Sequence, residues 1–403
     1  MHASSPAREK IWFHSSESLE RRSMGPLGLS EMKVAVIGGG VAGLALARSL
    51  CRGGAGGGER INVFERSTTM DRQGFGFLVL ENGQRALQSL GIDVLASGIG
   101  HALERVSILS SCGRSIAQHP VTHTIAVDRP SLLRALADGL PRGVIQFNHR
   151  FEAFEHDRDR MLSASFACGG QATLVRHSAD VFVGADGVNS RCRAHLTADR
   201  PSVPPRRARV NEIVACVHLP AVAATLGHRF VKVLDPSGGF AVGLVPLAKG
   251  RVIWFVQFDS HRFAPPAPGA ISSFLDTHLR SFPQFVRETI EATHPSLPHL
   301  WQPLDIDPPP RLARGNLVLA GDAAHPLLPF TSQGANTALE DAVCLSEQLL
   351  ACRLPMDLNR ALSTYHHQRH PSLKRYLHAG RTMAAQFVRP PAEVESTSLP
   401  LAK

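Results

Sequence analysis

A glycine-rich segment near the start of the sequence has the spacing of a phosphate-binding turn. Gly38, Gly40 and Gly43 occur as Gly-x-Gly-x-x-Gly, directly after a β-branched run and directly before an apolar segment with helical periodicity. In such a turn the first glycine allows the sharp bend, the second lets a pyrophosphate approach the backbone, and the third lets the helix pack on the strand. The free N–H groups at the helix start, at Val41 and Ala42, then face the phosphates. The segment predicts a dinucleotide site.

An acidic residue follows the second predicted strand at 61–64. Glu65 lies farther from Gly38 than the usual interval of about 20 residues, and a glycine-rich insertion at 51–60 accounts for the difference. A carboxylate at this position can bind the ribose hydroxyls of an adenosine. The pattern therefore favours a nucleotide with an adenosine half.

Two further motifs place a carboxylate after a predicted strand. Asp186-Gly187 is the first, and Gly321-Asp322 is the second, which precedes a helix expected over 333–350. Asp322 could accept hydrogen bonds from sugar-type hydroxyls, while the dipole at the helix start could stabilise a ligand that gains negative charge. Taken alone, the second motif would favour the simpler interpretation, an ordinary strand followed by an N-capped helix.

In combination, these motifs resemble those of the single-component FAD-dependent aromatic hydroxylases, the family typified by para-hydroxybenzoate hydroxylase. The three motifs occur in the order of that family. Arg129 opens a segment similar to the family's third conserved helix, and Tyr-x-x-x-Arg-x-Pro at 365–371 is similar to its closing helix. The resemblance covers about residues 32–380. It departs from the family pattern at Ser332, where glycine is usual.

The resemblance implies how FAD would be held. Glu65 would bind the adenosine ribose with Arg66 beside the adenine, Arg129 would neutralise the pyrophosphate, and Asp322 would hold the ribityl chain. Asp186 would support the pyrophosphate region, a position linked in this family with NAD(P)H use. The residues expected to bind the cofactor are Gly38, Gly40, Val41, Ala42, Gly43, Glu65, Arg66, Arg129, Asp186, Gly187, Asp322, Pro329, Gly334, Ala335 and Asn336. No catalytic residue is assigned, and no metal site is expected.

The activity implied by the resemblance is that of an FAD-dependent monooxygenase. It would use NAD(P)H and O2 to insert one oxygen atom into an aromatic or heteroaromatic substrate, by hydroxylation or epoxidation through a flavin C4a-hydroperoxide. An electron-rich ring, such as a phenol or a quinolone-type metabolite, suits an electrophilic peroxide. Few charged residues fall in the strand-like runs of 209–258, which favours an apolar, lipid-tailed or polycyclic substrate over a small aromatic acid. Two alternatives stay open: a flavin-dependent reductase or dehydrogenase without oxygen insertion, and a non-catalytic nucleotide-binding scaffold.

The elements that position these motifs indicate an α/β protein. We expect a Rossmann-type FAD-binding domain, like that of glutathione reductase, interleaved with an antiparallel β-sheet substrate domain. A hairpin at 104–118 and an amphipathic helix over 270–292 are predicted parts of the substrate domain. The expected segments are, for the FAD-binding domain, 32–100, 125–200 and 311–351; for the substrate domain, 101–124 and 201–310; and for the C-terminal helices and tail, 352–403.

Composition excludes several other classes of protein. The chain has 403 residues, of which 43% are hydrophobic and 19% charged, enough for the cores of two or three domains. Its net charge is +9, but the basic residues are scattered, so no nucleic-acid partner is indicated. The longest nearly apolar stretch, 34–47, is too short for an integral membrane segment.

The cysteines and the first residues suggest where the protein works. The seven cysteines include no Cys-x-x-Cys and suit neither zinc nor a disulfide framework. Reduced thiols in the cytoplasm are therefore expected, in a monomer or homodimer. Residues 1–31 are polar and mixed in charge, so we expect a disordered extension or a translation start at Met24 or Met32.

Overall fold

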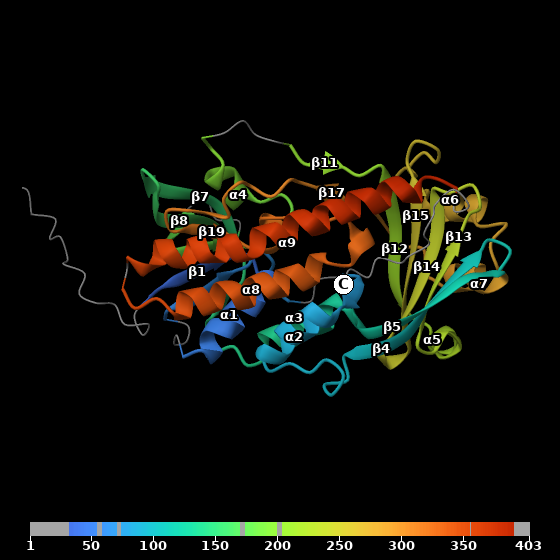
Figure 1. Cartoon of the computed structure of the whole chain (residues 1–403), viewed down its shortest axis with the longest axis horizontal. Coiled ribbons are helices and arrows are strands. Elements are labelled where there is room, and N and C mark those ends of the chain that lie inside the picture. Colours follow the sequence, from blue (N-terminus) through green and yellow to red (C-terminus); the bar gives the residue numbers. More distant parts are fainter. Residues whose placement is uncertain are drawn as a thin grey trace, which may run out of the picture.

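The structure, a computed structural model, describes residues 32–54, 59–70, 74–169, 174–199, 204–354 and 356–390. The predictions for 1–31 and for the end of the tail lie outside these residues. Two large sheets dominate the described part, one at each end of an elongated molecule (Figure 1). The α/β class is confirmed, while the division into an FAD-binding and a substrate domain stays a prediction.

A six-stranded sheet carries the glycine-rich turn. Neighbouring strands in this sheet run parallel, except for one antiparallel pair at an edge, β18 (Ala313–Arg314) with β19 (Leu317–Leu319). In spatial order the strands are β18, β19, β10 (Val181–Gly184), β1 (Val34–Ile37), β2 (Ile61–Phe64) and β6 (Ile145–Gln146). Because β19, β10 and β1 are neighbours, the motifs that follow them meet at one edge of the sheet.

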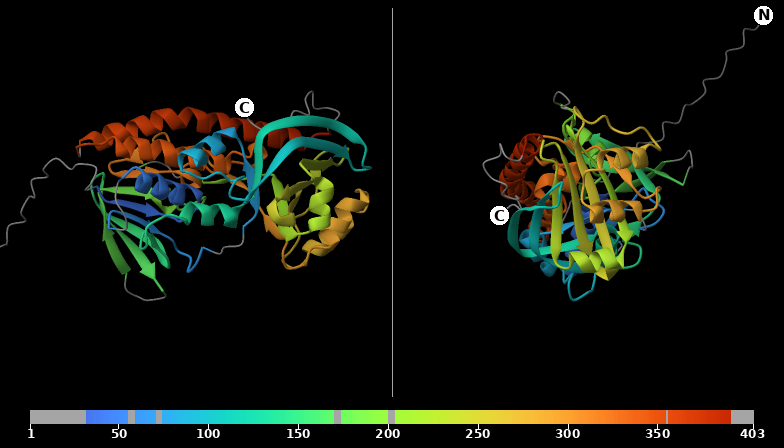
Figure 2. Two further views of the ribbon diagram at one scale, coloured as in Figure 1. Left: turned by 90° about the horizontal axis from the view of Figure 1, so that it is seen from below. Right: turned by 90° about the vertical axis from the view of Figure 1, so that its right-hand side faces the viewer.

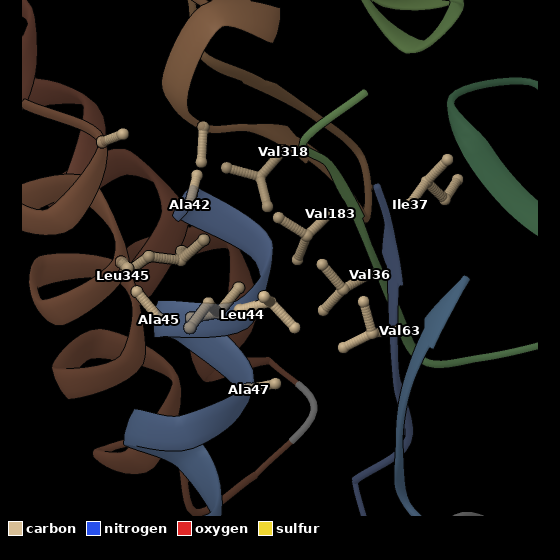
Figure 3. Close-up of a cluster of buried hydrophobic side chains, with 14 of the residues drawn as sticks. Val36, Ile37, Ala42, Leu44, Ala45, Ala47, Val63, Val183, Val318 and Leu345 are labelled. Atoms are coloured by element: carbon tan, nitrogen blue, oxygen red, sulfur yellow. The ribbon is translucent and has the colours of Figure 1, made fainter. Parts of the chain in front are cut away.

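The core of this sheet follows from its β-branched strands. Val36, Val63, Val183 and Val318 form one row across four neighbouring strands. Figure 3 shows these side chains pointing towards helix α1 (Val41–Arg52), whereas Ile37 points away from it. Such two-sided burial is typical of parallel strands and explains why the central strands β1, β10 and β19 have no polar side chain.

A small antiparallel sheet covers the opposite face. Its strands are β7 (His149–Asp157), β8 (Arg160–Cys168) and β9 (Leu174–Ser178). The ring of Phe64 in β2 stacks on Phe166 in β8 with 4.3 Å between centroids. The layers are therefore helices, parallel sheet and small sheet, as the left panel of Figure 2 shows.

The second large sheet has eight strands and is mixed. Its order is β16 (His299–Trp301), β12 (Val210–His218), β15 (Arg251–Asp259), β14 (Phe240–Leu247), β13 (Arg229–Leu234), β4 (Gly100–Ser110), β5 (Ser115–Asp128) and β3 (Gly76–Val79). The predicted hairpin is confirmed as β4 and β5. The sheet is mixed rather than the antiparallel sheet expected, because β13 pairs with β4 in parallel while the other pairs of the sheet are antiparallel. No hairpin joins these two strands, so no turn forces them to run in opposite directions.

Alternating residues give this sheet two different faces. One face packs Trp254, Val256 and Phe258 against helices α5 (Pro220–Leu226), α6 (Ile271–His278) and α7 (Gln284–Glu291). The single helix predicted over 270–292 is wrong: α6 ends at His278, and Pro283 caps α7. Proline disfavours helical geometry in the residue before it, which explains the interruption. Shorter elements elsewhere are α2 (Glu81–Ser89), α3 (Arg129–Ala137), α4 (Arg191–Leu196), β11 (Arg206–Arg207) and β17 (Leu304–Asp305).

Helix α9 (Asp357–Phe387) runs along the molecule from the parallel sheet to the eight-stranded sheet (Figure 1). Near one end Tyr365 donates a hydrogen bond to the carbonyl of Leu319, with 3.0 Å between oxygens. Near the other end Arg381 binds both carboxylate oxygens of Asp305, at 2.7 and 3.0 Å. The predicted final helix is thus confirmed, and it is anchored at both ends.

A buried carboxylate joins α9 to helix α8 (Gly334–Leu350) and to the Gly321 turn. Asp341 accepts hydrogen bonds from the backbone N–H of Gly321 at 2.9 Å and from Arg369 Nε at 2.7 Å. It also pairs with His325 Nε2. Burial alone would raise the pKa of Asp341, but His325 and Arg369 overcome this and hold that pKa well below its usual value.

Replacing this carboxylate should therefore destabilise the protein. We expect Asp341→Asn to lower the free energy of unfolding by about 3–5 kcal/mol, because it removes the buried carboxylate that pairs with both Arg369 and His325 and leaves Arg369 with only the more exposed Glu340. Glu81→Gln is the matched control, since Glu81 pairs with Arg85 on the surface of α2 and such pairs contribute about 1 kcal/mol or less. Denaturant unfolding of the two variants checks this. Equal losses in both would contradict it.

Candidate active site

A cleft of about 850 Å³ lies between the motif-bearing edge of the parallel sheet and the inner face of the eight-stranded sheet. Most of the predicted cofactor-binding residues line it. They are Gly38, Gly40, Val41, Ala42, Glu65, Arg66, Arg129, Asp186, Gly187, Asp322, Pro329, Gly334 and Ala335. Gly43 and Asn336 do not line it. The structure thus brings together motifs that are far apart in the sequence.

The space around each glycine of the turn explains why glycine occurs there. Gly38 has φ +111°, and a Cβ there would lie 2.2 Å from the carbonyl oxygen of Ala185. A Cβ on Gly43 would lie 2.0 Å from the carbonyl oxygen of Gly38. A Cβ on Gly40 would meet nothing within 4 Å, because this residue faces the cleft. The turn therefore leaves room for a ligand at Gly40 and for no side chain at the other two positions.

Glu65 connects the turn to the end of β2. Its Oε2 accepts a hydrogen bond from the backbone N–H of Gly39 at 2.9 Å, and its Oε1 accepts from the backbone and hydroxyl of Ser67 at 2.8 and 2.9 Å. The residue is only 8% exposed, yet it borders the cleft. Its carboxylate thus shapes the turn as well as the nucleotide end of the cleft.

The start of α8 provides a second open helix end. A Cβ on Gly334 would meet nothing within 4 Å, and Ala335 also borders the cleft. The buried side chain of Asn336 bonds to the backbone of Leu78 and Leu80 at 2.8 and 3.0 Å, and the cofactor contact predicted for its backbone stays a prediction. Ser332, which replaces the usual glycine, has φ +52°, a left-handed conformation in which glycine is unstrained.

The two carboxylates of the strand-end motifs have different surroundings. Asp186 caps α4 by accepting from the backbone N–H groups of Arg191 and Cys192 at 2.8 and 3.1 Å. Asp322 borders the cleft and is exposed to it. The protein around the cleft still desolvates its carboxylate and so raises its pKa, although the nearby charges of Arg129 and other cations oppose the shift. A donor-rich ligand in the cleft would offset the cost of keeping Asp322 ionised.

The predicted sites did not include three polar residues on the inner face of the eight-stranded sheet. Lys232 Nζ donates to Gln257 Oε1 at 2.9 Å, and Gln257 Nε2 donates to Glu212 Oε1 at 2.6 Å. All three border the cleft. Lys232 and Gln257 interrupt apolar runs, and Glu212 precedes one; alternation places all three on one face of the sheet. The sequence therefore carried a signal, but it did not show that this face lines a cleft rather than contacting solvent.

The cleft fits FAD by the chemistry of its walls. Two helix N-termini open onto it at Gly40 and Gly334, positions where a side chain would fill the cleft itself. Arg129 supplies positive charge, and Glu65 and Asp322 supply acceptors for sugar hydroxyls. Among the described residues, no cluster of three or more His, Cys, Asp or Glu could hold a metal ion. No helix in the described ranges is long and apolar enough to cross a membrane.

Comparison with known proteins assigns the family. A family described as FAD binding domain matches residues 31–379. A 3-amino-4-hydroxybenzoate 2-monooxygenase from Streptomyces platensis is 31% identical over 379 residues, covering 89% of each chain. The chain belongs to the FAD-dependent aromatic monooxygenases. The chain is also 28% identical to 6-hydroxynicotinate 3-monooxygenase from Pseudomonas fluorescens over 347 residues, covering 79% of this chain and 82% of the relative.

Solved structures agree with the fold of this monooxygenase. HpxO from Klebsiella pneumoniae, complexed with FAD and uric acid, superposes with a TM-score of 0.75 at 24% identity, over 88% of each chain. A salicylate hydroxylase substrate complex gives a TM-score of 0.72 at 22% identity, over 91% of this chain and 92% of the other. At these identities the likeness concerns the fold alone.

Two glycine variants should separate folding from cofactor binding. Gly40→Ala should change the stability of the FAD-free protein by about 1 kcal/mol or less, yet weaken FAD binding tenfold or more (about 1.4 kcal/mol) by obstructing the phosphates. Gly43→Ala should cost about 1–3 kcal/mol of stability without FAD, because its Cβ meets the Gly38 carbonyl. Denaturant unfolding and FAD titration measure the two effects. Tight FAD binding by Gly40→Ala would contradict the assignment.

Proposed function

We propose that this protein is a monooxygenase that uses FAD, NAD(P)H and O2 to insert one oxygen atom into an electron-rich aromatic or heteroaromatic ring. The observation that carries the proposal is the cleft in which two open helix N-termini face a mostly apolar sheet. When bound, FAD supplies the redox chemistry that activates O2. The side chains of the chain bind, orient and enclose the reactants.

The proposed cofactor contacts follow the surroundings of each residue. The turn from Gly38 to Gly43 would hold the pyrophosphate together with Arg129, and Glu65 would bind the adenosine ribose. Asp322 would bind the ribityl hydroxyls, whose hydrogen bonds favour its ionised form. The start of α8 would place its partial positive charge against the flavin ring, where negative charge develops on reduction.

The remaining walls of the cleft would exclude water. On one side, the lining of the cleft comes from the eight-stranded sheet and from the residue before β3. These residues are Phe75, Phe77, Val245, Ile253 and Phe255. Leu327, Leu328, Pro329 and Phe330 line it from the loop before α8. Excluding water protects reactive intermediates from unproductive decay and strengthens polar contacts inside the site. A flat, apolar ring is the shape that these walls would hold.

The substrate proposal draws on the relatives. The two monooxygenases compared above are named for substrates that carry a ring hydroxyl, on a benzoate and on a nicotinate. We place this protein's substrate among hydroxylated aromatic or heteroaromatic compounds. We place the protein itself in the cytoplasm, because all seven cysteines are unpaired, as reducing compartments require.

Isotope labelling tests the activity. With bound FAD, NAD(P)H and ¹⁸O₂, we expect one labelled oxygen atom in the product from a panel of hydroxylated benzoates, hydroxypyridines and phenols, detected by mass spectrometry. NAD(P)H oxidation without labelled product from any compound would instead favour the reductase alternative.

A variant of α3 tests the pyrophosphate contact. Arg129→Ala should weaken FAD binding by about 1.5–3 kcal/mol, the usual worth of a charge-assisted contact. Arg134→Ala is the matched control, because it removes the same charge from an exposed position of the same helix. FAD titration compares the two. Equal affinities in both variants would reject the contact.

A further inference from the structure

Three polar side chains form a connected row across the inner face of the eight-stranded sheet. They come from β13, β15 and β12, and the row runs from Lys232 through Gln257 to Glu212, over hydrogen bonds of 2.9 and 2.6 Å. Lys232 and Glu212 are the charged side chains that this sheet contributes to the cleft lining within the described ranges. An isolated charge is costly in such surroundings, so the row calls for an explanation.

The row depends on two small residues in the strand between its members. On β14, Gly243 lies opposite Lys232, and Ala241 lies opposite Gln257. Neither has a side chain long enough to block the cleft face of the sheet. The lysine can therefore reach across β14 to the amide on β15, and a larger residue at Gly243 would collide with the ring of Phe255.

The ammonium group of Lys232 retains donor capacity towards the cleft. It has three N–H donors, and within the described part of the chain Gln257 is its one hydrogen-bond acceptor. No described carboxylate lies within 4 Å of it, so Glu212 acts through the amide rather than by direct contact. The ring of Phe387 in α9 lies 5.5 Å from Nζ and adds only a weak cation–π attraction.

The pKa values of Lys232 and Glu212 show that each charge only partly offsets the cost of burying the other. Burial lowers the pKa of Lys232 to about 8, against the opposing attraction of Glu212. Burial also raises the pKa of Glu212 to about 7, although Gln257 and Lys232 favour its ionised form. An anion placed on Lys232 would favour the charged lysine, and the same anion would be repelled by an ionised Glu212.

We propose that Lys232 binds an ionised oxygen of the substrate, while Gln257 orients the ammonium group and Glu212 limits how strongly it attracts anions. The substrate is then an aromatic or heteroaromatic acid, a ring that carries a carboxylate or an acidic hydroxyl. This inference rests on the proposed monooxygenase function. It replaces the expectation of an apolar substrate, since the polar row lies on the strands from which that expectation was drawn.

The row predicts opposite effects for two substitutions. Lys232→Met keeps the apolar stem and removes the charge, so acids should lose about tenfold or more in affinity, as expected for a hydrogen bond to a charged group. Glu212→Gln can still accept from Gln257 but removes the like charge, so acids should bind several-fold more tightly. General damage to the site would weaken binding in both variants.

Calorimetric titration of the FAD-loaded protein tests this with matched ligands. The carboxylate arm compares 6-hydroxynicotinate with 6-hydroxynicotinamide, and the hydroxyl arm compares 4-nitrophenol with 4-nitroanisole. The wild-type protein should prefer the acid in at least one arm by about tenfold or more. Lys232→Met should abolish that preference. Lys249→Met, in the exposed turn between β14 and β15, is the control and should retain it.

The outcomes separate the inference from the function on which it rests. A preference that survives in Lys232→Met, no preference in either arm, no binding of any acid, or weaker acid binding by Glu212→Gln would each overturn the inference. The visible flavin spectrum of every variant shows that the protein is folded and loaded. Failure of the wild-type protein to incorporate ¹⁸O would overturn the monooxygenase function, whatever the calorimetry shows.

Discussion

The close approach of two backbones, at the ends of β1 and β10, is the constraint on which the cleft depends. The N–H of Ala185 bonds to the carbonyl of Ile37 at 2.8 Å, and the chain then turns at Gly38 with no space for a Cβ. This contact sets the first turn of α1 beside the Asp186 motif. The same edge receives the Gly321 turn from β19. Three segments that are far apart in the chain thus share one rim because parallel strands end together.

The two halves of the cleft are stabilised by different physics. On the nucleotide side, backbone groups and carboxylates at strand ends provide polar contacts, and the supporting core is a row of valines under α1. On the sheet side the walls are mostly apolar, and three strands contribute one connected polar row. The first arrangement suits a charged, flexible cofactor. The second suits a flat ring that has one polar end.

Features that depend on local interactions were predicted from the sequence, whereas features that depend on contacts between distant residues were not. The glycine turn, the acidic strand ends and the long helix of α8 depend on local geometry, and the structure bears out the elements that carry them. The parallel pairing of β13 with β4 depends on contacts across more than a hundred residues, for which no local pattern exists. Likewise, Lys232 meets Gln257 only because of strand register. The break at Pro283, by contrast, was readable from the sequence.

Helix α9 has a mechanical consequence. It is a single helix of 31 residues, with Tyr365 and Arg369 attached to the parallel-sheet side and Arg381 attached to Asp305 beside the eight-stranded sheet. The helix holds the two sheets at a fixed distance, since they cannot separate without bending it or breaking the ion pair between Arg381 and Asp305. The width of the cleft is therefore set before any ligand arrives.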